Sequence, residues 1–263
     1  MNRYLRNLAL CAAILSPLAA QAETPEEKGL SIAREMDLRN SGWGDSTSTM
    51  QMVLRNRQGE ESKRGVRVRT MEQSSDGDKS LMIFDEPRDV KGTVLLTYAH
   101  KTAVDDDHWL FLPSVKRVKR IAGNNKSGPF MGSEFAFEDL GIQEIEKFTY
   151  KYIKDDVFDG HETFVLERYP LEKNSGYTRQ VMWIDKLEYR QRKIDYYDRK
   201  SSLLKTLVFS AYSEYLDLYW RPQKLEMVNH QTGKSTTMEF AQYQFRTGLS
   251  DRDFDQASLS AAK

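Results

Sequence analysis

WLFLPSVKRVKRIAGNNKSGPFMGSEFAFEDL, residues 109–140, is the stretch around which the chain is organised. It opens as a predicted strand over 109–112, which Pro113 ends. Four cations without an acid among them follow, then a polar loop and a turn rich in Phe and Met. Apolar groups beside fixed cations suit an amphiphile, because acyl chains need an apolar surface and an anionic head group needs positive charge. An ordinary exposed hairpin could have the same composition.

The first 22 residues have the pattern of a cleaved export signal. Arg3 and Arg6 precede an apolar run over 8–20, and Ala20-Gln21-Ala22 is a small-residue cleavage site. The run is too short to span a membrane, and the cleavage pattern disfavours a retained anchor. We therefore expect a signal peptide over 1–22 and a mature domain over 23–263, located in the periplasm of a bacterium.

Charge and cysteine content exclude several classes of protein. The whole chain has 39 basic and 39 acidic residues, and removal of Arg3 and Arg6 leaves 37 against 39. Such a balance gives no reason to expect nucleic acid as a partner. Cys11, the one cysteine, lies in the predicted signal, after Leu10 and outside a lipidation pattern. The mature chain is therefore expected to have no disulfide, no reactive thiol and no lipid anchor.

The hydrophobic pattern predicts a β-rich domain behind one helix. Residues 24–40 have helical spacing of apolar residues, a Thr cap and Pro25 in the first turn. From Met50 onward, apolar and polar residues alternate, with turn signals such as Asp76-Gly77 and Asp159-Gly160. We expect a single domain with ten or eleven strands in an antiparallel meander, at the spacing of a barrel or sandwich.

Catalytic and metal-binding patterns are weak. The four histidines form no zinc motif, and neither a nucleophile elbow nor a phosphate-binding loop is present. Residues 105–108, Asp-Asp-Asp-His, could offer oxygen ligands but fit a solvated turn better. Glu134, Glu138 and Asp139 are expected to cap their segment or pair with cations. We predict no enzyme, metal or cofactor; a lipid hydrolase that uses Glu134, Glu138 or His108 is a remaining alternative.

Two groups of residues are candidates for binding. The first would line an apolar site and the second would contact a head group or a protein partner. Each has a simpler interpretation, as plain core for the first and as a solvated hairpin face for the second. The apolar candidates are Trp109, Phe111, Phe130, Met131, Phe135 and Phe137, and the cationic candidates are Lys116, Arg117, Lys119 and Arg120.

Two motifs carry a family resemblance. LPSVKRVKRI over 112–121 and GPFMGSEFAFEDL over 128–140 resemble the signature of periplasmic outer-membrane lipoprotein-sorting-like proteins, relatives of the LolA and LolB carriers. The P-x-D-x-K-G-T pattern over 87–93 extends the match. The resemblance implies a single strongly curved antiparallel sheet, an incomplete barrel, with helices over its open concave side. It also implies an apolar concave face that shelters acyl chains and hands them over without ATP.

The resemblance leaves the cargo open. This chain is longer than the LolA carrier, and relatives of its type look like companions of RND-type lipid exporters, so the cargo is either a lipid or a lipoprotein. The missing lipidation pattern favours a soluble, LolA-like role over an anchored acceptor. We also expect a monomer. The predicted function is therefore a periplasmic carrier. The alternative is an accessory module that docks on an RND-type exporter and carries nothing.

Overall fold

The computed structural model describes residues 22–141 and 143–261. The predicted signal peptide thus lies outside the described residues, apart from Ala22. In the described part, no helix has both the length and the apolar character needed to cross a membrane.

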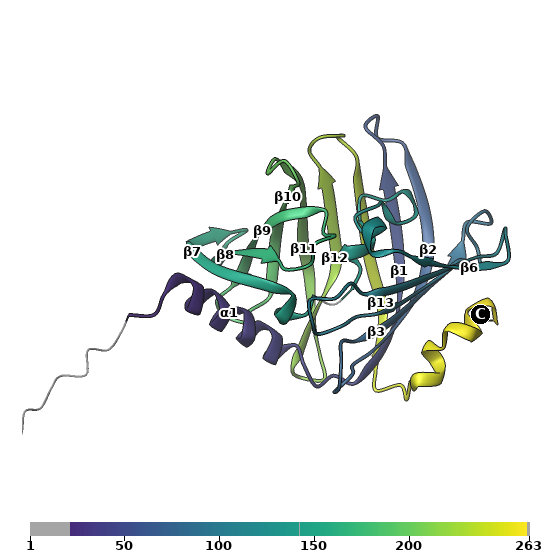
Figure 1. The fold of residues 1–263 in the computed structure, drawn as a ribbon, viewed down its shortest axis with the longest axis horizontal. Coiled ribbons are helices and arrows are strands. Elements are labelled where there is room, and N and C mark those ends of the chain that lie inside the picture. The colour runs from purple at the N-terminus through teal and green to yellow at the C-terminus, as the bar shows by residue number, and fades with distance from the viewer. Residues whose placement is uncertain (1–21, 142, 262–263) are drawn as a thin grey trace, which may run out of the picture.

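Thirteen strands form one antiparallel sheet (Figure 1). Each strand pairs with its neighbours in sequence, except that β1 also pairs with β13 and that β6 and β7 form the two edges. Figure 1 shows the sheet curved and open, so the predicted single curved antiparallel sheet is confirmed. The strands are β1 Asp45–Arg55, β2 Glu61–Met71, β3 Lys79–Glu86, β4 Val94–Tyr98, β5 Asp107–Leu112, β6 Arg117–Ile121, β7 Phe148–Phe158, β8 His161–Pro170, β9 Tyr177–Asp185, β10 Gln191–Asp198, β11 Leu203–Tyr215, β12 Tyr219–Asn229 and β13 Ser235–Phe245.

The predicted count of ten or eleven strands was too low. Strand β6 was not predicted, because three of its five residues are cations and only Ile121 is buried, so the apolar alternation of a strand is missing. Such a composition suits a strand with one unpaired edge, where charge opposes pairing with another chain.

Helix α1, Pro25–Arg39, covers the other edge of the sheet. Thr24 caps it, and the side chain of Glu27 returns a hydrogen bond to the cap. Gly29 lets the helix approach β7 closely, since a Cβ there would lie 2.8 Å from the backbone nitrogen of Tyr152. The helix therefore closes the β7 edge, and β6 remains the open edge of the sheet.

The sheet has two apolar faces, each covered by a different segment. We call the face that carries Met50, Val66 and Phe84 the inner face, and the opposite face the outer face. The covering segment, residues 122–147, contains four short 3₁₀ helices and packs on the inner face. Two C-terminal 3₁₀ helices, η5 Asp251–Phe254 and η6 Gln256–Ala261, pack on the outer face, where Figure 1 shows them outside the sheet. The chain therefore covers both faces, not only the concave side.

Candidate functional site

Apolar side chains run without a break across the inner face. Leu166 on β8 pairs with Met182, which pairs with Ile194, and Ile194 pairs with Leu207. The row continues from Leu207 to Met227 on β12. A second row crosses from β11 to β1 and consists of Phe209, Leu225, Met238 and Met52. Since strand residues alternate between faces, both rows belong to one continuous apolar surface.

The covering segment closes one part of this surface and leaves another part open. Phe84 and Phe130 are fully buried, and their ring centroids lie 5.7 Å apart. Phe209, Leu225 and Phe240, by contrast, pack against the same core and stay partly exposed. The inner face thus offers an apolar floor with direct access from solvent over β11–β13.

Methionines are concentrated on the inner face. Eight of the ten methionines belong to its cluster: Met36, Met50, Met52, Met82, Met131, Met182, Met227 and Met238. Met71, three residues after the inward-facing Val68, packs on the outer face. Methionine is unbranched and adapts to different partners, so this surface suits flexible apolar ligands of variable shape.

Buried polar contacts fasten the covering segment to the sheet. Lys205 Nζ donates to the Glu134 carbonyl at 2.9 Å and to Asp139 Oδ2 at 2.6 Å. Tyr177 donates its hydroxyl proton to the other oxygen of Asp139, and the Asn229 amide donates to Glu134 at 2.7 Å. Glu134 and Asp139 therefore hold the covering segment on the sheet through hydrogen bonds and an ion pair. This agrees with the expectation that they cap their segment or pair with cations.

Glu138 fastens the segment to the loop between β8 and β9. Its carboxylate accepts from the Gly176 backbone and from the Ser175 hydroxyl, both at 2.8 Å. Burial, reinforced by the negative charge of Asp139, raises the pKa of Glu138 to about 7. A raised carboxyl pKa stabilises the folded state below about pH 4.5, and that stabilisation is lost as the pH rises through about 7.

Glu138→Gln is expected to remove this pH dependence. The Gln amide can accept from Gly176 and donate to Ser175, so the contacts survive without a buried charge. Thermal melts at several pH values should show the two proteins alike near pH 5, with the variant more stable by ~2 kcal/mol at pH 8. Parallel decline of both proteins between these pH values would contradict the assignment of this titration to Glu138.

Residues 105–107 serve as ion-pair partners. Asp105 accepts from Lys126 at 3.0 Å, Asp106 pairs with Lys147, and Asp107 pairs with Arg120. Burial lowers the pKa of His108 to about 4, and its Nδ1 lies 2.9 Å from the Thr97 hydroxyl. Among the described residues, no group of three His, Cys, Asp or Glu side chains could hold a metal ion.

The predicted apolar candidates divide between the two faces. Phe130, Phe135 and Phe137 are buried in the inner cluster, and Met131 is partly exposed beside them. Trp109 and Phe111 are not brought to this face. They alternate with the inward-facing residues of β5 and pack on the outer face, against the cluster that holds Phe254 and Leu259. We therefore leave Trp109 and Phe111 out of the candidate site.

The predicted cations form an exposed hairpin tip and edge strand. Lys116 lies in the turn and the other three on β6, and all four are exposed. Arg120 pairs with Asp107, whereas Lys116, Arg117 and Lys119 form no ion pair with any described residue. Val115 and Val118 beside them are 57% and 39% exposed. Free cations next to exposed apolar groups make this hairpin a candidate contact surface.

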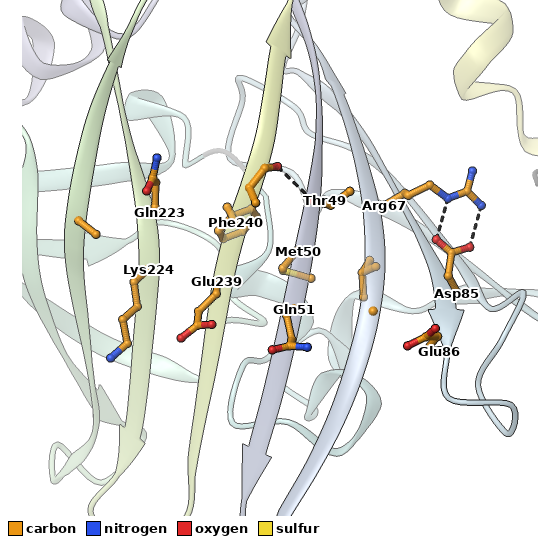
Figure 2. A pocket seen from close by; sticks show the side chains of 14 residues that line it. Thr49, Met50, Gln51, Arg67, Asp85, Glu86, Gln223, Lys224, Glu239 and Phe240 are labelled. Atoms are coloured by element: carbon orange, nitrogen blue, oxygen red, sulfur yellow. Dashed lines mark hydrogen bonds and ion pairs between the residues drawn. The ribbon is translucent and has the colours of Figure 1, made fainter.

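An open pocket of about 670 Å³ lies across β1–β3 and β11–β13 (Figure 2). Most of its accessible wall is apolar, but charged and polar side chains also line it, such as Thr49 and Gln51, which alternate with inner-face residues. Figure 2 shows Arg67 and Asp85 at one end, joined by two hydrogen bonds of 2.7 and 2.8 Å. An acyl chain in this pocket would cover charged groups such as Arg67 and Asp85 and remove water from them, which is unfavourable.

Comparisons with known proteins agree with this fold. A family model described as an uncharacterized protein matches residues 76–261. A domain assigned to outer-membrane lipoprotein sorting, from Vibrio parahaemolyticus, is 54% identical, with a TM-score of 0.88 over 89% of this chain and 99% of that chain. A DUF1329 family protein from Desulfovibrio piger is 30% identical, with a TM-score of 0.85 over 90% and 99%.

A more distant likeness shows the fold alone. A LolA superfamily protein from Nitrosomonas europaea is 19% identical, with a TM-score of 0.70 over 87% of this chain and 98% of that chain. No curated protein matches the chain in sequence. The LolA-like fold is thus common to the chain and to its structural neighbours.

Proposed function

Because this chain belongs to the family of the lipoprotein-sorting and DUF1329 proteins, we propose that it is a carrier of acyl chains in the periplasm. It would shelter the chains of lipids or lipoproteins on its inner face and hand them over towards the outer membrane. The export-signal pattern of residues 1–22 supports the location. The observation that carries the proposal is the continuous apolar floor, part of which stays open to solvent over β11–β13.

Physical chemistry explains how such a face would work. An acyl chain in water gains ~0.8 kcal/mol for each CH₂ group that it buries. The rows that end at Met227 and Met52 run across the strands, so a long chain could lie over several strands in succession. Release requires only that the acceptor offer equal burial, which makes transfer reversible and independent of ATP. The proposed carrier has no catalytic step and acts as a monomer.

Native mass spectrometry with lipid extraction tests the proposal. The chain from Glu23 onward, purified without detergent, is expected to retain phospholipid or an acylated peptide, or to take up a fluorescent fatty acid when this is offered. A protein that is empty, and that stays empty in the presence of excess lipid, would rule the carrier out.

A second candidate is an accessory subunit that docks on an RND-type exporter and carries no cargo. The unpaired cations Lys116, Arg117 and Lys119 favour it, because they offer a contact surface apart from the apolar floor. Charge reversal at these positions should then abolish docking in a cross-linking assay. On this alternative, neither the variant nor the unaltered protein would contain lipid on its inner face.

A further inference from the structure

The hairpin tips of the sheet separate positive from negative charge. In an antiparallel meander, successive tips lie at alternate rims. Five neighbouring tips lie at one rim: 113–117, 87–92, 56–60, 230–234 and 199–202, in the order of the sheet. We call these five tips the cationic rim. They hold eight basic residues, Arg57, Arg88, Lys91, Lys116, Arg117, Arg199, Lys200 and Lys234, against two acids, Glu60 and Asp89. The sixth turn of this rim, 171–176, adds one residue of each sign, Lys173 and Glu172.

The tips at the opposite rim have the reverse balance. These five turns are 72–78, 99–106, 159–160, 186–190 and 216–218. They hold eight acids, Glu72, Asp76, Asp78, Asp105, Asp106, Asp159, Glu188 and Asp217, against three bases, Lys101, Lys186 and Arg190. If the charged residues of the tips served only solubility, basic and acidic residues would be mixed at both rims. Their separation between the rims therefore indicates that one rim contacts a charged partner.

The cations of the rim are free to meet a partner, except that the Arg199 guanidinium donates to the backbone carbonyls of Asn174 and Ser175, both at 3.2 Å. All eight are exposed, and none forms an ion pair with a described residue. Neighbouring tips also touch: Gln231 donates to Asp198 at 2.9 Å, and an added Cβ at Gly233 would lie 3.4 Å from Arg57. Pro113 lies against Gly92 in the same way. Figure 1 shows the β10–β11, β12–β13 and β1–β2 tips along one side of the sheet.

We propose that the cationic rim docks the protein on an anionic phospholipid surface. The charge is complementary, and it is spread over separate short tips along many strands, which suits a broad surface better than a single groove on a protein. Val115, which is 57% exposed at the β5–β6 tip beside Lys116, can enter the head-group region. Each basic residue near such a surface strengthens binding about fivefold at most, and less where neighbouring tips share the contact.

Docking would place the carrier in a defined orientation. The β10–β11 and β12–β13 tips belong to the rim, and β11–β13 carry the open part of the inner face, with Phe209, Leu225 and Phe240. Cargo could then pass between bilayer and apolar floor along the same strands. This use of the rim rests on the proposed carrier function; the docking itself does not, and it can be measured without cargo.

Vesicle flotation with the chain from Glu23 onward tests the docking. We expect binding to vesicles rich in phosphatidylglycerol at low salt, no binding to pure phosphatidylcholine, and release near 1 M salt, where the Debye length is about 3 Å. A rim variant with Gln at Arg57, Lys91, Lys116 and Lys234 should bind about a hundredfold more weakly. A control with Gln at Arg34, Lys151, Arg246 and Arg252, all exposed, should change less than about threefold.

Equal loss in both variants, or no binding of the unaltered protein at low salt, would overturn the proposal. Binding of the rim to an acidic protein but not to vesicles would also overturn it, in favour of a protein partner. Fluorescent fatty acid binding, measured without vesicles, should be the same in all three proteins. Failure of that binding would count against the carrier function and leave the flotation result unaffected.

Discussion

Replacing Lys205 with methionine is expected to lower the free energy of unfolding by about 3–5 kcal/mol. Lys205 is 4% exposed, and its ammonium group lies between the Glu134 carbonyl and the carboxylate of Asp139, whose side chain is 1% exposed. Without the ammonium group, a buried negative charge has no counter-charge. Urea unfolding monitored by circular dichroism should show a lower midpoint and an unchanged slope.

Two further variants test the cause of that loss. Lys205→Met combined with Asp139→Asn should recover part of the stability, because the variant no longer buries an unpaired carboxylate. Lys224→Met removes a pair with Glu226 in which both side chains are more than 40% exposed, and should cost less than about 1 kcal/mol. Similar losses in Lys205→Met and Lys224→Met would show that the covering segment is not held by its buried contacts.

Glutamate at Phe209 and Leu225 is expected to weaken binding of a fluorescent fatty acid at least tenfold. The two residues face each other across β11 and β12 on the open part of the inner face. A carboxylate there stays hydrated and keeps an acyl chain from the floor. Since both sites are partly exposed, the fold should tolerate the change.

Ser210→Glu is the matched control for that experiment. Ser210 neighbours Phe209 in the strand and faces the other side of the sheet, opposite Lys224. It adds one negative charge to β11, as Glu at Phe209 does, but on the other face, and should leave fatty acid affinity within about twofold. Equal loss in the control and the inner-face variants would place the binding site elsewhere.

Much of the fold could be predicted from sequence because strand periodicity is local. Alternating residues such as Met50 and Met52, with turns such as Asp76-Gly77, mark strands without knowledge of their partners. The charged strand β6 escaped this logic, since it has one buried residue and no alternation. The family motifs supplied the curvature of the sheet, which periodicity alone does not contain.

The candidate site was less predictable, for a physical reason. Alternation shows that Trp109 and Leu110 face opposite sides, but not which side meets which covering segment. That choice depends on contacts with residues 122–147 and with Phe254, far away in sequence. The sequence predicted strands around Phe209 and Leu225 but not that these residues stay partly exposed. Their exposure depends on how far the covering segment extends over the inner face.

Photolabelling with a diazirine fatty acid, followed by peptide mapping, tests most directly whether the inner face is the binding site. Label is expected on peptides from β11–β13 and on the turn that contains Met131, and Glu at Phe209 and Leu225 should abolish it. Label on the outer face near Trp109 and Phe254, or labelling unaffected by those substitutions, would contradict the carrier function proposed for the inner face.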